Sequence, residues 1–273
     1  MQTIYMNKKI IDFNKAKGFI CDMDGVIYHG NKVLPGVQEF IHWLQAKNKK
    51  YLFLTNNSGM TPKELREKLR RMDLDVPEEN FYTSALATAQ FLKNQAAGCS
   101  AFVIGEAGLL NALYDVGISM NDVDPDYVVV GEGRSYSLDT LTKAVNLVNR
   151  GAKLIGANFD VSGPCENGIA PACRALTAPI EMATGRKAYF CGKPNPLMMR
   201  TGLKLLGCHS EEAVIVGDNM DTDIIAGCES GVSTVLVLSG VSSLSTPKLY
   251  AYQPTMILNG VGDIVRIAEK NRQ

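Results

Sequence analysis

Two aspartates follow a short apolar segment near the start of the chain, in the order Cys21-Asp22-Met23-Asp24-Gly25. Side chains two residues apart in an extended segment share a face, so these carboxylates would lie close together. Such a pair repels unless one carboxylate holds a proton or a cation lies between them. The arrangement suits covalent chemistry in which one carboxylate attacks and the other donates and recovers a proton. The alternative is a turn whose aspartates bond to nearby backbone.

Hydroxyl and amide side chains follow a second apolar segment. Residues 51–54 lead directly into Thr55, Asn56, Asn57 and Ser58. Such groups, with free backbone N–H groups at a helix start, can hold phosphate oxygens. A helix or turn cap is the equally plain alternative for these residue types.

A lysine lies between a glycine and a proline in Gly192-Lys193-Pro194. The proline disfavours a helical conformation at Lys193 and favours an extended one. A stiff loop of this kind could aim the ammonium group at a fixed point. The alternative is an ordinary surface lysine.

Three aspartates fall within six residues near the C-terminal third of the chain: Asp218, Asp221 and Asp223. They follow the apolar residues 213–216, and carboxylate oxygens are the ligands that Mg²⁺ prefers. The alternative is a helix N-terminus rich in aspartate, which the helix dipole favours. That alternative accounts for Asp221 and partly for Asp223, but not for Asp218 so close to an apolar strand.

These residues must be positioned by elements of an α/β fold. The pattern predicts strands at four apolar segments, 18–21, 51–54, 213–216 and 234–238. It predicts helices over 37–47, in a segment from Thr61 and in one from Asp221. Such alternation predicts a parallel sheet with helices on both faces. Ligands bind at the carboxyl ends of strands in these sheets, where the polar residues above lie.

A second alternating set lies between these segments and predicts an inserted domain. Strands are expected at 101–104, 127–130 and 153–156, with helices through 113 and over 138–148. We therefore predict a core formed by residues 1–83 and 187–273 and an inserted α/β domain over 84–186. A last strand is expected near 255–258 and a closing helix from 261.

Composition narrows the class of protein further. The 273 residues include 28 Lys+Arg and 28 Asp+Glu, which gives a formal net charge of +0. The chain therefore lacks the excess of basic residues that is typical of a nucleic-acid-binding protein. Seven cysteines are scattered without a C-x-x-C pair, which favours reduced thiols in a cytoplasmic protein. Residues 1–17 show no signal peptide, and no apolar stretch reaches the length of a membrane span.

Together the four polar segments read Asp-x-Asp-Gly, Thr-Asn, Lys-Pro and Gly-Asp-x-x-x-x-Asp. This set resembles the motifs of the haloacid dehalogenase-like hydrolase superfamily. The stretches 19–28, 53–58, 192–196 and 214–241, with the insertion, resemble its NagD-type branch of nucleotide and sugar phosphatases. The resemblance implies a Rossmann-like parallel sheet core with an inserted α/β cap domain that covers the site and contacts the substrate beyond its phosphate.

The resemblance also implies a role for each site residue. Asp22 would attack phosphorus and form an aspartyl phosphate, and Asp24 would protonate the leaving oxygen and then activate water. Thr55 and the backbone at Asn56 would hold phosphoryl oxygens, and Lys193 would orient the nucleophile and offset phosphate charge. Mg²⁺ would be held by Asp22, Asp24 through its carbonyl, Asp218 and Asp223, and the substrate would also lie beside Asn219, Met220, Asp221 and Thr222.

The implied substrates are small phosphate monoesters, with nucleoside monophosphates or sugar phosphates first. Loops 158–163 and 166–168, the latter before a helix expected at Ala170, are candidates for substrate contacts. Two alternatives remain on the same residues, a phosphotransferase or mutase and a receiver-like phosphorylation switch. The second acid, Asp24, and the insertion argue against the switch, and a binding protein without activity is a further alternative. The resemblance also suggests pairing of subunits through the cap.

Overall fold

The computed structural model describes residues 11–134, 136–165 and 168–270. Contacts divide these residues into two compact units. The first unit comprises residues 11–55, 67–81 and 199–270, and the second comprises 56–66 and 82–198. The predicted division into a core (1–83 and 187–273) and an insertion (84–186) stays a prediction. Among the described residues, none of the helices combines the length and apolar character needed to span a bilayer.

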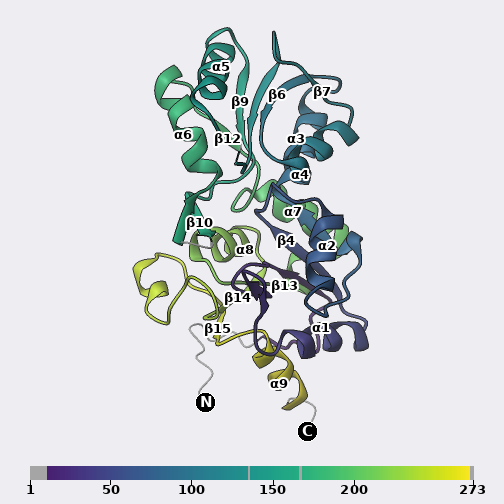
Figure 1. Ribbon diagram of the computed structural model, residues 1–273. Coiled ribbons are helices and arrows are strands. Elements are labelled where there is room, and N and C mark those ends of the chain that lie inside the picture. The colour runs from purple at the N-terminus through teal and green to yellow at the C-terminus, as the bar shows by residue number, and fades with distance from the viewer. Residues whose placement is uncertain (1–10, 135, 166–167, 271–273) are drawn as a thin grey trace. The chain divides into compact units, whose positions relative to one another are not determined.

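The first unit is built on a six-stranded sheet in the order β15-β14-β13-β1-β4-β5 (Figure 1). Neighbouring strands from β15 to β4 run parallel, as the alternating pattern predicts. The central strand β1 is buried along its whole length, as expected for a strand covered on both faces. The strands are β1 (Gly18–Cys21), β4 (Lys50–Thr55), β5 (Phe81–Thr83), β13 (Ala213–Gly217), β14 (Ser233–Val237) and β15 (Met256–Leu258).

Two helices form where the sequence predicts them, one from residue 37 and one directly after Thr61. Helix α1 (Val37–Ala46) buries Phe40 and Trp43, and both rings pack edge-on against Phe19 of β1. Helix α2 (Pro62–Arg70) begins with a capping box, since Glu64 N donates to Thr61 Oγ1 and Thr61 N donates to Glu64 Oε2. Helix α7 (Pro196–Leu206) begins in the second unit and continues into the first at Met199, and the first unit also contains α8 (Ile225–Glu229) and α9 (Gly262–Lys270).

The second unit has its own five-stranded sheet, in the order β12-β9-β8-β6-β7, and all its pairs are parallel. Figure 1 shows α5 and α6 on one face of this sheet and α3 and α4 on the other, so each face has its own apolar core. The strands are β6 (Ser100–Ile104), β7 (Ser119–Met120), β8 (Tyr127–Val130), β9 (Lys153–Gly156) and β12 (Tyr189–Phe190), and the helices are α3 (Ser84–Gln95), α4 (Ala107–Asp115), α5 (Leu138–Asn149) and α6 (Cys173–Thr184).

One predicted helix start is wrong. The helix expected at Ala170 begins at Cys173, because residues 168–171 form the second strand of an antiparallel hairpin, β10 (Ser162–Cys165) and β11 (Gly168–Pro171). Pro171 favours an extended residue before it, which delays the helix. A shorter hairpin, β2 (Tyr28–His29) with β3 (Lys32–Val33), follows the paired aspartates. Short helical turns complete the chain: η1 (Glu78–Asn80), η2 (Ser210–Glu212), η3 (Met220–Ile224) and η4 (Thr246–Leu249).

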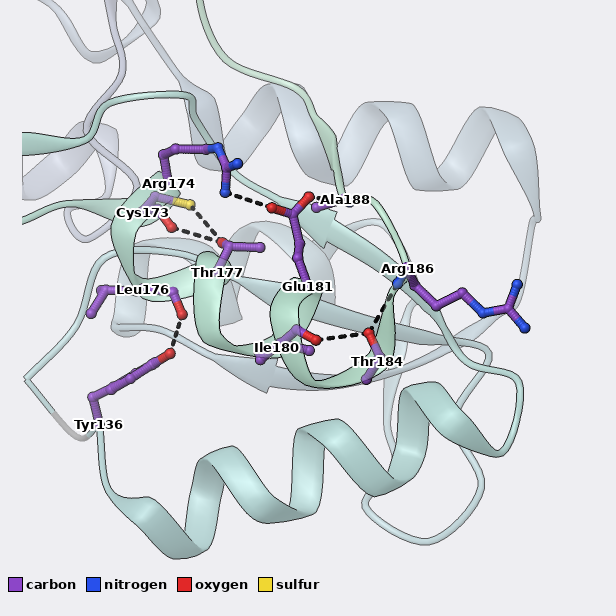
Figure 2. A network of polar contacts seen from close by, with 10 residues as sticks. All are labelled: Tyr136, Cys173, Arg174, Leu176, Thr177, Ile180, Glu181, Thr184, Arg186 and Ala188. Carbon is purple, nitrogen blue, oxygen red and sulfur yellow. Dashed lines mark hydrogen bonds and ion pairs between the residues drawn. The ribbon is translucent and has the colours of Figure 1, made fainter.

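A polar network fixes α6 to the segment that leads toward Lys193 (Figure 2). Arg174 and Glu181 on this helix form an ion pair with 2.6 Å between nitrogen and oxygen. Glu181 Oε1 also accepts a hydrogen bond from Ala188 N at 2.8 Å, directly before β12. Because the Glu181 side chain is buried, these bonds satisfy a charge that would otherwise be costly to bury. The helix therefore fixes the start of β12. This strand has two residues and leads directly into the turn formed by residues 191–193.

Candidate active site

Three carboxylates meet at the carboxyl edge of the sheet in the first unit. Strands β1 and β13 are neighbours, and Asp22 N donates to Val216 O at 2.9 Å, which continues their pairing beyond β1. Asp22 and Asp218 therefore follow adjacent strand ends, and Asp223 lies in the turn that follows. One oxygen of each carboxylate lies within 4.8 Å of the others, and the two later aspartates are buried. Like charges this close repel one another, and a cation between them would offset that repulsion.

Glycines line the loops around this cluster, and two of them lie too close to the Asp218 carboxylate to carry a side chain. Asp218 Oδ2 accepts a hydrogen bond from Val241 N at 2.7 Å, and Asp223 Oδ2 accepts one from Asn219 N at 3.2 Å. A Cβ atom at Gly240 would lie 1.9 Å from Asp218 Oδ2, and one at Gly25, whose φ is +76°, would lie 2.4 Å away. This glycine-lined cradle with three hard oxygen donors fits a small divalent cation such as Mg²⁺.

Asp24 lies in the turn after β1, where Gly25 N donates to Tyr28 O at 2.8 Å. Its side chain reaches solvent, yet the protein atoms around it reduce its hydration and raise the pKa of the carboxyl group. The nearby Lys68 opposes this by attraction, while Asp22 raises the pKa further. A carboxyl group held partly toward its protonated form suits an acid that must give up a proton.

Lys68, which the sequence analysis missed, lies beside Asp24. It belongs to α2, and its Nζ atom lies 3.8 Å from the centre of the Tyr28 ring. Burial lowers the pKa of Lys68, and attraction to Asp24 opposes that shift. Spacing along the chain could not reveal this residue, because Lys68 is one of several charged residues on α2 and the sequence does not show which of them lies near Asp24.

Thr55 is the last residue of β4, next to β1 in the sheet. The parallel register pairs Cys21 with Phe53, so Thr55 ends its strand at the same edge as Asp22. Thr55 is buried. The structure therefore brings Asp22, Thr55, Asp218 and Asp223 to one sheet edge, with Asp24 in the turn that follows β1.

Asn56 and Lys193 belong to the second unit and are bonded to each other. Lys193 N donates to Asn56 Oδ1 at 2.7 Å, and Asn56 Nδ2 donates to Lys193 O at 3.1 Å, across 137 residues of sequence. Asn56 Nδ2 also donates to Asp160 Oδ1 at 3.1 Å. The turn that contains Lys193 is thus held by the side chain of the residue directly after Thr55.

The predicted segment after Asp218 forms a helical turn with mostly structural contacts. Asn219 Oδ1 accepts from Asp221 N at 2.9 Å and so caps the turn, and Asp221 accepts a hydrogen bond from Tyr250 at 2.7 Å. The Met220 side chain packs in an apolar cluster, and Thr222 is buried. Contacts of this segment with a substrate stay a prediction.

The candidate loops of the second unit are partly described. Asn158 and Asp160 belong to the polar network around Asn56, whereas residues 166 and 167 lie outside the described part of the chain. Glu132, which was not among the predicted site residues, accepts hydrogen bonds from Ser58 N and Asn158 Nδ2. Asp218 was predicted because an acidic residue comes soon after an apolar strand. Glu132 has the same position, since only Gly131 separates it from the apolar strand β8.

Family comparisons cover both ends of the chain. A family described as haloacid dehalogenase-like hydrolase matches residues 19–119, and a related HAD hydrolase-like family matches residues 190–264. These two ranges include all the predicted catalytic and metal-binding residues.

Individual relatives match over nearly the full length. The chain is 44% identical over 246 residues to dihydroxyacetone phosphatase from Corynebacterium glutamicum, covering 90% of each protein. It is 45% identical to the ribonucleotide monophosphatase NagD from Escherichia coli, covering 91% of this chain and 98% of that protein. The structure of Escherichia coli NagD superposes with a TM-score of 0.86 over 91% of this chain and 98% of that chain, at 44% identity. A 4-nitrophenylphosphatase from Thermotoga maritima superposes with a TM-score of 0.90 at 31% identity, over 95% and 100% of the two chains.

Proposed function

Because the chain belongs to the haloacid dehalogenase-like hydrolases and is a phosphatase of that family, we propose that it is a Mg²⁺-dependent hydrolase of small phosphate monoesters with Asp22 as nucleophile. The observation that carries this proposal is the cluster of Asp22, Asp218 and Asp223, whose oxygens lie within 4.8 Å of one another. A phosphate dianion could not approach these charges without a counter-ion. The proposed cation therefore serves both the protein and the substrate.

The proposed reaction has two steps. A carboxylate oxygen of Asp22 attacks phosphorus while the bond to the leaving oxygen breaks, and Asp24 gives its proton to that oxygen. Asp24, now ionised, then takes a proton from water, whose oxygen attacks phosphorus as the bond to Asp22 breaks. Inorganic phosphate leaves, and both aspartates return to their starting states. The raised pKa of Asp24 supports its role as the acid of the first step.

The remaining site residues would stabilise the negative charge of the phosphoryl group, either directly or through the Mg²⁺ ion. Asp22, Asp218, Asp223 and the carbonyl of Asp24 would hold the Mg²⁺ ion, which would stabilise negative charge on the transferring phosphoryl group. Thr55 and the backbone N–H of Asn56 would donate hydrogen bonds to the phosphoryl oxygens, and Lys193 would offset their charge. Hydrolysis of a phosphate monoester requires on the order of 20 kcal/mol of barrier lowering. A covalent step and several positioned donors together are a reasonable source of it.

Substrates are proposed from the named relatives. One of them is named for dihydroxyacetone phosphate and another for ribonucleotide monophosphates, so small phosphorylated sugars and nucleotides are the first compounds to test. The inserted domain, predicted over residues 84–186, would act as the cap that contacts the leaving group. A cytoplasmic location, suggested by seven free cysteines, and pairing of subunits through the cap complete the proposal.

The test is phosphate release from a panel of phosphate monoesters with and without Mg²⁺. We expect release from at least one compound, loss of release with a chelator, and a fall on the order of 10³-fold or more in Asp22→Asn. Asp115→Asn, which neutralises an exposed carboxylate on α4, is the matched control and should keep full activity. Full activity of Asp22→Asn would disprove the assignment of the nucleophile.

A further inference from the structure

We propose that Glu132 is a positioning residue that sets the place of Lys193 through a chain of hydrogen bonds running over Asn158 and Asn56. The inference rests on the proposed function for its activity readout, but its geometry lies wholly within the second unit. Glu132 touches neither substrate nor reacting atoms in this proposal. Glu132 instead fixes the position of Asn56, whose side chain bonds to the backbone of Lys193.

The first part of the chain of bonds is the attachment of Glu132 to the loop after Thr55. Glu132 Oε2 accepts from Ser58 N at 3.3 Å, and Glu132 N donates to Ser58 Oγ at 2.9 Å. Glu132 Oε1 accepts from Asn158 Nδ2 at 3.1 Å. A charged acceptor makes stronger hydrogen bonds than a neutral one, so this carboxylate is a firm attachment point.

The second part joins this attachment to Asn56. Asn158 Nδ2 also donates to Asn56 O at 2.6 Å, and Ser84 Oγ donates to the same carbonyl at 2.6 Å. Asn56, Ser84 and Asn158 are all buried, and Asn158 is fully so. Buried polar networks are rigid when every member is satisfied, and each bond lost leaves a polar group unpaired.

The third part joins Asn56 to Lys193. The Asn56 amide accepts from Lys193 N at 2.7 Å and donates to Lys193 O at 3.1 Å, so it fixes the backbone on both sides of the Lys193 Cα. The packing is tight, because a Cβ atom at Gly192 would lie 2.6 Å from Asn56 Oδ1. A shift of the Asn56 loop must therefore shift the lysine turn as well.

The experiment removes one acceptor and keeps the size of the side chain. Glu132→Gln replaces one carboxylate oxygen with an NH₂ group, which cannot accept from Ser58 N or Asn158 Nδ2. We expect kcat to fall roughly 10-fold, because displacements near 1 Å can cost as much as 100-fold, while KM changes less than about 2-fold. Asp115→Asn in the same unit is the control and should leave both constants unchanged.

A double-mutant cycle separates positioning from general damage. In a Lys193→Ala background the ammonium group is absent, so adding Glu132→Gln should cost almost nothing further. If Glu132→Gln lowers activity as much without Lys193 as with it, the positioning role is wrong. If Glu132→Gln lowers activity equally in both backgrounds and also lowers Tm strongly, its role is purely structural and the proposal is overturned.

Hydrogen exchange gives a readout that does not depend on activity. The Lys193 N–H should exchange at least 10-fold faster in Glu132→Gln than in the wild-type protein or in Asp115→Asn. If the wild-type protein shows no release of phosphate that depends on Asp22, the proposed function fails while this measurement still decides the geometry. Unchanged exchange at Lys193 would overturn the positioning role whatever the activity.

Discussion

At the scale of single residues, Asp24 is subject to opposing influences from its surroundings. Reduced hydration and the neighbouring Asp22 raise the pKa of its carboxyl group, while Lys68 lowers it. Lys68 is half-buried over the Tyr28 ring, so its charge is poorly screened and acts at short range. The protonation state of the proposed acid therefore depends on a residue of α2 that makes no contact with the metal cradle in the proposed mechanism.

Replacing Lys68 with methionine tests this dependence. Removal of a nearby positive charge disfavours the carboxylate, so the pKa of Asp24 should rise further. Because the first step needs Asp24 protonated, the alkaline limb of kcat/KM should move to higher pH in Lys68→Met. Loss of the contact with the Tyr28 ring should also cost about 0.5–1 kcal/mol of stability.

The control for this variant is Lys63→Met, an exposed lysine on the same helix. It should leave the pH profile and Tm unchanged. A profile of Lys68→Met that shifts to lower pH, or does not shift, would contradict the role given to the Asp24–Lys68 pair.

The site residues that sequence could predict share one property. Asp22, Asp218 and Thr55 directly follow or end apolar segments, so the rule that ligands bind at carboxyl ends of strands selects them. Lys68 could not be found in this way, because its partners come from a different segment and only packing brings them together. Glu132 follows an apolar strand as well, and only the hydrogen bonds of the second unit reveal its partners.

At the scale of elements, the loop after β14 forms one wall of the proposed metal cradle. Gly240 lies against the Asp218 carboxylate, and Val241 N donates to that carboxylate at 2.7 Å. Ser239 Oγ donates to Gly25 O at 2.7 Å and ties this loop to the turn after β1. The loop thus closes the cradle with backbone atoms, which leaves no room for a side chain.

Gly240→Ala should therefore disrupt the cradle. Its Cβ would lie 1.9 Å from Asp218 Oδ2, so the carboxylate or the loop must move. We expect the Mg²⁺ concentration for half-maximal phosphate release to rise about 10-fold or more, since one displaced ligand weakens the site. Titration of the protein with Mg²⁺ by calorimetry checks the same change without substrate.

Gly260→Ala is the matched control in the same unit, since its nearest neighbour would be 3.9 Å from the new Cβ. It should bind Mg²⁺ as the wild-type protein does. Equal Mg²⁺ affinity in Gly240→Ala and Gly260→Ala would contradict the expected displacement of the Asp218 carboxylate.

Elements with a strong apolar pattern were predictable almost to the residue. The predicted strands 18–21, 127–130 and 153–156 coincide with β1, β8 and β9. The hairpin of β10 and β11 escaped prediction, because its residues are mostly small or exposed and carry no alternating pattern. Cross-strand hydrogen bonds form such elements, and these bonds are not visible in a single segment.

At the scale of the whole molecule, two parallel sheets of similar design share one chain. Each unit has strands buried between helices, and each has polar residues at the carboxyl ends of its strands. The alternating pattern predicted both sheets, since a strand buried on both faces is a continuous apolar segment. The exact borders of the units depend on contacts between distant segments such as 56–66 and 158–193, which the pattern does not contain.

Burial across both units also predicts which cysteines react. Cys173 and Cys191 are fully buried, and burial raises the pKa of their thiols to about 11 and about 12. At pH 8 fewer than about one in a thousand of these thiols would be ionised, so they should resist alkylation in the folded protein. Cys165 is exposed and should react first. Cys228 also reaches solvent but should react more slowly, because the protein atoms around its thiol reduce hydration and raise its pKa.

Iodoacetamide labelling at pH 8 followed by peptide mass spectrometry checks this order. All seven cysteines should label once the protein is unfolded in guanidinium chloride, since each thiol then has an ordinary pKa and full access. Labelling of Cys173 or Cys191 in the folded protein at the rate of Cys165 would contradict the packing of the second unit. That packing includes Cys173 on α6 and Cys191 beside the lysine turn, so the same result would also weaken the geometry from which the role of Glu132 is inferred.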